Sequence, residues 1–216
     1  MDFAGAYSLN NLKFLLQGFA VTLEVAFISI VLSFLLGGLI GTLRYAKIPF
    51  VSKLLTVVVE TIRNLPLLLI IFFTYFALPE IGLKLPITAA AIVSLTMFES
   101  AMLSEIIRSG LNSVEKGQIE AARSSGLTYV QTLGSIILPQ ALRRMVPPIV
   151  SQFISLLKDT SLAVVIALPE LTHNAQIIYG QKSGYVIPMI LILAFMYFAV
   201  NYSLSMVAKK METKKA

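Results

Sequence analysis

Cysteine and tryptophan are absent from this 216-residue chain, and histidine occurs once, at position 173. Without cysteine, disulfide bonds and thiolate metal sites are excluded. His173 has no second histidine or cysteine with which to share a metal ion, so we expect it to be a solvated loop residue. One histidine and no cysteine also leave no Ser-His-Asp or Cys-His arrangement for nucleophilic catalysis. We therefore predict no catalytic residue and no metal site in this chain.

Charged residues are scarce as well. They make up 13% of the chain, whereas hydrophobic residues make up 57% and the mean hydropathy is +0.84. Because a soluble domain carries roughly a quarter charged residues, this composition indicates a membrane protein. Five apolar segments each come near the ~20 residues that a helix needs to cross a bilayer. They cover roughly residues 19–43, 54–78, 86–107, 146–168 and 186–207. We predict an all-α integral membrane protein with five transmembrane helices.

The net charge of +6 is distributed unevenly around these segments. Basic residues gather after the first segment, between the third and fourth, and after the fifth, all on one side of a five-span topology. Twelve lie on that side and three on the other: Arg44, Lys47, Lys53, Arg108, Lys116, Arg123, Arg143, Arg144, Lys209, Lys210, Lys214 and Lys215 against Lys13, Lys84 and Lys182. Since basic residues favour the cytoplasmic side, we predict the N-terminus outside and the C-terminus inside. Membrane topology accounts for the charge without a nucleic-acid partner.

The longest polar segment, residues 108–145, is well punctuated. Asn112 and Glu115 are spaced as an N-terminal cap for a short helix. Gly126 stands where such a helix would end in a left-handed residue. A second helix should then end or kink at Pro139, because proline clashes with the preceding turn. The sequence thus predicts a compact cytoplasmic projection between the third and fourth spans.

A motif at fixed spacing lies inside this projection. Glu120-Ala121-Ala122 is followed by Gly126 at +6 and by Leu138-Pro139 at +18 and +19. The two alanines leave one face small enough for a partner to approach the backbone, and Glu120 and Arg123 are spaced to pair across one turn. The alternative is an ordinary linker that contains this tripeptide by chance, and the number of matched positions argues against it.

The motif resembles the EAA loop of ABC-importer permeases. The resemblance covers about residues 18–209 and is strongest to permeases for polar amino acids of the histidine/glutamine type. It includes Leu138-Pro139-Gln140-Ala141-Leu142-Arg143-Arg144, Pro147-Pro148 and Leu157-Lys158-Asp159-Thr160-Ser161-Leu162. It implies a single transmembrane domain over residues 1–216 with the type I ABC importer permease fold, a cytoplasmic coupling helix and a place in the bacterial cell membrane.

The resemblance also implies partners. A separate ATPase would dock on Glu120, Ala121, Ala122, Arg123, Gly126, Leu138 and Pro139. This chain has no G-x-x-x-x-G-K-[ST] phosphate loop, so ATP and magnesium would be held by that ATPase and no cofactor by this chain. An extracytoplasmic solute-binding protein and a second permease subunit, identical or related, complete the expected assembly. Glutamine or glutamate is the favoured substrate by resemblance.

Several polar residues lie within the spans, where an unpaired charge is costly. A free amino acid carries charges of both signs, so the candidates for its pathway are Arg63, Glu99, Ser100, Lys158, Asp159, Thr160 and Ser161. Arg63 and Glu99 fall at comparable heights in straight spans and could meet, as a substrate-responsive pair or as a permanent structural one. The run of four polar residues from Lys158 cannot share one helical face, which predicts that this part of the span lines a cavity or breaks locally. The alternative is an ion pair that packs helices together and never meets substrate.

Two alternatives to an importer permease remain at this point. A secondary amino-acid transporter would need no ATPase, but such proteins usually carry internal repeats, and none is visible here. A membrane-embedded assembly or signalling protein is the other.

Gly37 and Gly41 form a G-x-x-x-G that lets helices approach closely, either within this chain or between two subunits.

Overall fold

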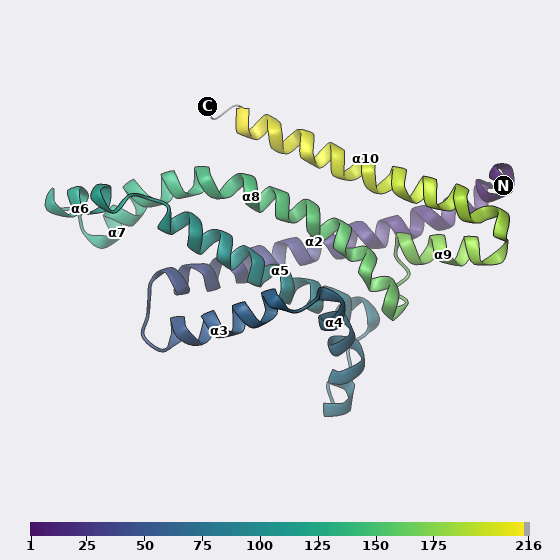
Figure 1. The fold of residues 1–216 in the computed structure, drawn as a ribbon, viewed down its shortest axis with the longest axis horizontal. Helices are drawn as coiled ribbons and strands as arrows, with labels where there is room; N and C mark the ends of the chain where they lie inside the picture. The colour runs from purple at the N-terminus through teal and green to yellow at the C-terminus, as the bar shows by residue number, and fades with distance from the viewer. Residues whose placement is uncertain (214–216) are drawn as a thin grey trace. The chain divides into compact units, whose positions relative to one another are not determined.

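The computed structural model describes residues 1–213, without the side chains of residues 207, 208 and 211–213, and this part of the chain contains helices and no strand (Figure 1). Lys214 and Lys215 lie outside it. The α-helices are α1 (Phe3–Ala6), α2 (Leu9–Tyr45), α3 (Val51–Asn64), α4 (Leu67–Phe72), α5 (Ile87–Asn112), α6 (Lys116–Ser124), α7 (Tyr129–Thr132), α8 (Leu138–Asp159), α9 (Leu171–Gln181) and α10 (Val186–Thr213). Two π-helical segments, η1 (Phe73–Ala77) and η3 (Leu133–Ile137), and three 3₁₀ segments, η2 (Leu78–Ile81), η4 (Thr160–Ile166) and η5 (Ser183–Tyr185), complete the order.

Within residues 1–213, four helical stretches are long and apolar enough to cross a membrane: Leu9–Tyr45, Ile87–Asn112, Tyr129–Ile166 and Ser183–Met206. They confirm four of the predicted spans, with different ends. The first begins ten residues earlier than predicted. Both edges of the predicted loop 108–145 are helical, because α5 runs to Asn112 and a new helix starts at Tyr129. The segment that projects from the spans is therefore residues 113–128.

The predicted second span, 54–78, is wrong as a single straight helix. Val51–Asn64 and Leu67–Ile81 are long and apolar enough to cross a membrane only when they are taken together, and the chain bends by 104° between them. Pro66 lies at this bend with extended backbone angles of φ −60° and ψ 131°. Proline lacks an N–H for the helix and disfavours helical geometry in the residue before it, so α3 ends at Asn64 and a new helix starts after Pro66.

Two compact units can be separated in the chain. The first comprises Met1–Val31, Leu65–Thr96 and the chain from Phe153, and the second comprises Leu32–Asn64 and Met97–Gln152. In the first unit, buried apolar residues of α1, α2, α9 and α10 form one cluster: Ala6, Leu15, Leu171, Ala175, Ile178 and Met189. His173 lies in α9 and is half-buried, so its assignment to a solvated loop is wrong.

A buried carboxylate connects two helices of this first unit. Glu170 is fully buried at the start of α9 and accepts hydrogen bonds from the backbone N–H groups of Thr172 at 2.9 Å and His173 at 2.8 Å. The hydroxyl of Tyr197 on α10 donates to it at 3.2 Å. Burial raises the pKa of Glu170, and these donors act in the opposite direction. The carboxylate thus caps α9 and links it to α10.

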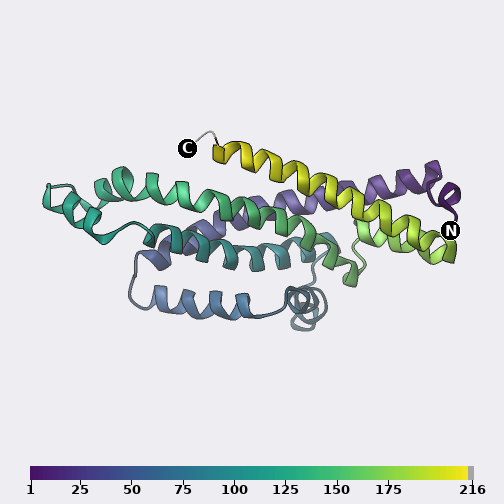
Figure 2. The same cartoon turned by 45° about the horizontal axis from the view of Figure 1, so that its top comes forward.

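In the second unit, α3 runs back beside the end of α2 (Figures 1 and 2). The Ser52 hydroxyl of α3 donates to the carbonyl of Leu43 at 2.9 Å. On α2, Gly37 and Gly41 face α5. A Cβ atom on Gly37 would lie 2.8 Å from the Cβ of Leu103, and one on Gly41 would lie 2.7 Å from the carbonyl oxygen of Ser104. The G-x-x-x-G therefore serves packing within the chain.

These contacts predict how alanine substitutions differ along α2. Gly37→Ala overpacks the contact with α5 and should lower stability by about 1–3 kcal/mol. Gly38→Ala is the matched control, because a Cβ there meets nothing within 4 Å. It should be neutral or stabilising by up to ~1 kcal/mol, from the higher helix propensity of alanine. Thermal unfolding of the purified protein in detergent measures both, and equal midpoints for the two variants would contradict this packing.

Candidate functional site

The segment 113–128, which we call the knob, contains α6 and the turn after it. α6 ends in a left-handed Gly126, with φ 89°. The N–H of Gly126 donates to the carbonyl of Arg123 at 3.0 Å, and the N–H of Leu127 donates to the carbonyl of Ala122 at 3.2 Å. This pair of bonds is a Schellman motif, which satisfies carbonyls that a helix end leaves free. The predicted role of Gly126 as a helix stop is confirmed.

Two other local predictions for the knob are wrong. Glu115 precedes α6 without a capping hydrogen bond from its side chain, and Asn112 donates to the carbonyl of Arg108 at 2.8 Å. Arg123 donates to the carbonyl of Leu127 at 2.8 Å and forms no ion pair with Glu120. In both cases the side chain donates to a backbone carbonyl four residues away instead of binding the expected partner.

The knob is anchored to α8 at two points. The side-chain amide of Gln140 donates to the Oε1 of Gln118 at 2.6 Å, and the guanidinium of Arg144 donates to the carbonyl of Ser113. Thr128 and Gln131 add a capping box that starts α7. The T-x-x-Q spacing of that box is a recognised helix-start signal, so this cap is visible in the sequence. The knob is thus a short helix and turn held against the first half of α8.

Most of the predicted coupling residues form an exposed surface. Glu120, Ala121, Arg123 and Gly126 are exposed, whereas Ala122 is only 8% exposed and faces the knob interior. Leu138 and Pro139 are exposed on the first turn of α8.

Of the predicted end or kink at Pro139, the end is wrong. The π-helical segment η3 comes just before α8, and the chain passes through Pro139 as helix. The departure from α-helical geometry therefore lies in the turn before the proline.

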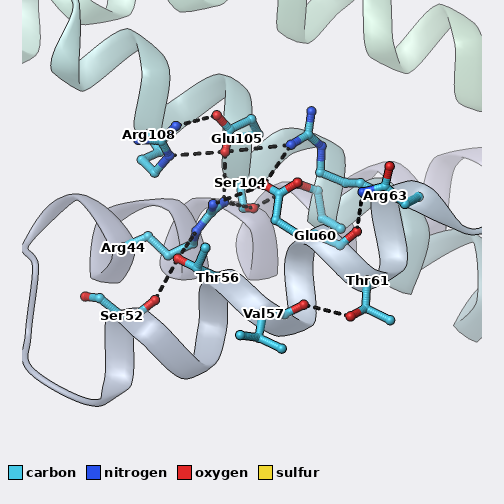
Figure 3. Close-up of polar contacts among 12 residues, drawn as sticks. Arg44, Ser52, Thr56, Val57, Glu60, Thr61, Arg63, Ser104, Glu105 and Arg108 are labelled. Atoms are coloured by element: carbon cyan, nitrogen blue, oxygen red, sulfur yellow. Dashed lines mark hydrogen bonds and ion pairs between the residues drawn. The ribbon is translucent and has the colours of Figure 1, made fainter.

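Five charged side chains from α2, α3 and α5 meet in the second unit, and we call them the charge cluster: Arg44, Glu60, Arg63, Glu105 and Arg108 (Figure 3). The Arg44 side chain is 3% exposed, and its Nη1 lies 3.0 Å from Oε2 of Glu105. The same guanidinium lies 3.7 Å from Glu60 and donates to the hydroxyls of Ser104 and Thr56, each at 3.3 Å. A buried guanidinium needs such partners, because an uncompensated charge is strongly destabilising.

Glu105 is the centre of the cluster. Its Oε1 lies 2.5 Å from Nη2 of Arg108, and its Oε2 lies 3.9 Å from Nη1 of Arg63. Arg63 also binds Glu60 on its own helix at 3.1 Å. Arg63 therefore does not pair with Glu99, and that prediction is wrong. The comparison of heights assumed a straight second span, whereas α3 ends one residue after Arg63.

Glu99 is buried elsewhere in the second unit, with 1% of its surface exposed. It accepts a hydrogen bond at 3.1 Å from the side-chain amide of Gln152, which places one polar residue of α8 against one of α5. Gln152 was missed, because a lone glutamine in an apolar span gives no pattern. Ser100, the next residue of α5, is 4% exposed, so its side chain is also buried in the protein.

The run that starts at Lys158 also breaks as predicted. α8 ends at Asp159 and the 3₁₀ segment η4 begins at Thr160. Lys158 is exposed, Asp159 and Ser161 are half-buried and Thr160 is fully buried, so the four side chains do not share one face. Among residues 1–213, no group of three or more His, Asp or Glu side chains is arranged to hold a metal ion. A role in a substrate pathway stays a prediction for all four residues of the run.

Known proteins resemble this chain over nearly its whole length. Residues 29–213 match the family described as binding-protein-dependent transport system inner membrane component. The probable glutamine ABC transporter permease protein GlnP of Bacillus subtilis (strain 168) is 73% identical, and the match covers 100% of both chains. The glutamate/aspartate import permease protein GltK of Escherichia coli O157:H7 is 34% identical over 100% of this chain and 99% of its own. A crystal structure of an amino acid ABC transporter with histidines superposes with a TM-score of 0.89 at 30% identity, over 95% of this chain and 96% of that one.

Proposed function

The chain belongs to the family of binding-protein-dependent transport system inner membrane components, and from this premise we propose that it is the permease through which glutamine enters the cell. It is a multi-pass protein of the bacterial cell membrane with the type I ABC importer permease fold, and it serves the import of polar amino acids. Family membership decides against a stand-alone secondary transporter and against an assembly or signalling protein. The observation that carries the choice of glutamine is the 73% identity to a probable glutamine permease.

The proposed assembly contains two permease subunits, two copies of a separate ATPase and an extracytoplasmic binding protein. The family description names dependence on a binding protein. This chain has no phosphate loop, which supports ATP hydrolysis in a partner and no cofactor in this subunit. Uptake of radiolabelled glutamine by vesicles that contain the reconstituted complex tests the proposal. Uptake of a basic amino acid alone would contradict it.

The knob is the proposed docking element for the ATPase. Its exposed surface carries Glu120 and Ala121, and the hydrogen bonds at Gln140 and Arg144 join it to α8, so a force on the knob reaches a spanning helix directly. We place the knob on the cytoplasmic side, from the distribution of basic residues. A cysteine placed at Gln118 should then react with an impermeant reagent only from inside the cell.

Substitutions in the knob should uncouple ATP hydrolysis from transport. Gly126→Val forces a β-branched residue into a left-handed conformation and should distort the turn after α6. Gly82→Val is a matched control, because Gly82 has the same φ of 89° and equally open surroundings but follows η2, outside the knob. Both should cost about 1–2 kcal/mol of backbone strain. Only Gly126→Val should reduce the ATPase activity that substrate and binding protein stimulate.

The charge on the knob gives a second test of the same idea. Glu120→Lys should reverse a contact with the ATPase, and Glu80→Lys makes the same change at an exposed residue of η2. Stimulated ATPase activity should fall about tenfold or more in the first variant, as expected for the loss of one charged contact at an interface. Wild-type stimulation in both knob variants would refute docking at the knob.

The buried pair of Glu99 and Gln152, with Ser100 beside it in the sequence, is a proposed polar point on the substrate pathway. The run from Lys158 to Ser161 is a separate candidate for the same pathway. A carboxylate can receive the ammonium group of an amino acid, and an amide can bind its carboxylate. Arg63 forms ion pairs with Glu60 at 3.1 Å and Glu105 at 3.9 Å, which supports a structural role for it.

Neutral substitutions of Glu99 and Arg63 distinguish a role in the substrate pathway from a structural role. Glu99→Gln keeps the size of the side chain but removes its charge, so it should raise the transport KM or change amino-acid preference. Arg63→Gln should lower thermal stability and leave the preference unchanged, since it removes a partner of the charge cluster. Transport with a panel of amino acids measures both variants. An unchanged KM and preference in Glu99→Gln would exclude Glu99 from the pathway.

A further inference from the structure

An open cleft of about 610 Å³ lies between the end of α2 and the start of α3, beside the charge cluster. Its lining includes Arg44, Lys47, Phe50, Lys53, Glu60 and Arg108. Figure 3 shows the chain returning from α2 into α3 at this place, with Arg44 and Arg108 on its inner side. Neither the knob nor the buried pair of Glu99 and Gln152 contributes to this lining.

Positive charge is in excess in the cleft. Four cationic side chains line it, against the single carboxylate of Glu60. Arg44 and Arg108 are bound to Glu105. Lys47 and Lys53 are exposed and form no ion pair among residues 1–213. The two ammonium groups of Lys47 and Lys53 are therefore the uncompensated charges of this cleft, because the guanidinium groups that line it are paired with carboxylates.

Apolar side chains lie directly beside these lysines. Phe50 is 81% exposed, and Leu54 and Val57 on α3 are 54% and 60% exposed. In the turn itself, Lys47 and Phe50 have positive φ values of 51° and 65°. Such strained backbone persists only where the surrounding structure holds it, so the turn presents a lysine and an aromatic ring in a defined arrangement.

The cleft also lies near the ends of two helices that are long and apolar enough to cross a membrane. α2, a candidate span of 37 residues, stops at Tyr45, two residues before Lys47. Arg108 comes four residues before the end of α5, which continues into the knob. A basic cleft bordered by exposed apolar surface, at the ends of spanning helices, matches a phospholipid with an anionic headgroup.

We propose that this cleft binds the phosphate group of an anionic phospholipid, with its acyl chains along the exposed apolar side of α3. Lys47 and Lys53 contact the phosphate, and Phe50 lies against the glycerol and upper acyl region, as aromatic rings do at membrane interfaces. The site is independent of the transported amino acid and of ATPase docking, so its failure would leave the proposed function untouched.

Native mass spectrometry of the purified transporter in detergent tests this site with phosphatidylglycerol and phosphatidylcholine as probes. The wild type should retain phosphatidylglycerol in preference to phosphatidylcholine. Lys47→Gln/Lys53→Gln should lower its apparent affinity about tenfold or more, because both free charges are removed. Lys13→Gln/Lys84→Gln removes the same charge from exposed residues outside the cleft and should bind like the wild type. Thermal unfolding of each variant without lipid confirms that it is folded.

Three results would overturn the proposal. Equal retention of phosphatidylglycerol by the two double variants would show that the cleft does not bind it. Thermal stabilisation of the wild type by inorganic phosphate but not by phosphatidylglycerol would assign the cleft to a free anion. Loss of the ATPase from the Lys47→Gln/Lys53→Gln complex, with lipid retention unchanged, would make the cleft a protein contact.

Discussion

A guanidinium buried in a membrane protein must be neutralised where it lies, and the second unit of this chain is built around that constraint. The Arg44 side chain is 3% exposed and lies 3.0 Å from Glu105. Three guanidinium and two carboxylate groups in the charge cluster join α2, α3 and α5 near their ends. Removing one partner would leave a buried charge without compensation, so the three helix ends are held in one arrangement.

This arrangement supports the knob. α5 passes from Glu105 through Arg108 to Asn112, and the knob begins at the next residue. The knob is bound on its other side to α8 through Gln140 and Arg144. The same two helices carry Glu99 and Gln152 farther from the knob. If the knob moved while the end of α5 stayed fixed, the position of α8 relative to α5 would change. The hydrogen bond between Gln152 on α8 and Glu99 on α5 depends on that position.

The features that could be predicted from the sequence are local ones. The lengths of the apolar segments predicted four of the spans. Gly126, after α6, predicted a left-handed helix end, and the spacing of Gly37 and Gly41 indicated a close contact between helices. Each depends on residues a few positions apart. The EAA spacing located the knob for the same reason, although its helices begin and end at residues that differ from those expected.

Apart from the two wrong side-chain pairings at the knob, which are local, the failures involve contacts between distant residues. The pairing of Arg63 with Glu99 assumed a straight span, and the bend at Pro66 removes that assumption. Glu105 binds three arginines from three helices, and Gln152 reaches Glu99 across 53 positions, so neither contact leaves a periodic signal in the chain. The cleft beside Lys47 depends on backbone angles that lysine and phenylalanine rarely adopt.

A double-mutant cycle between Arg44 and Glu105 tests the central role of the charge cluster most directly. Arg44→Leu, Glu105→Leu and the combined variant would be compared by thermal unfolding in detergent, with the exposed pair Asp2 and Lys182 as a control cycle. Each single change should cost about 3–5 kcal/mol, and the combined change should cost clearly less than their sum, because it leaves no uncompensated charge. The control cycle should show almost no coupling. Additive losses for Arg44 and Glu105 would contradict this account of the fold.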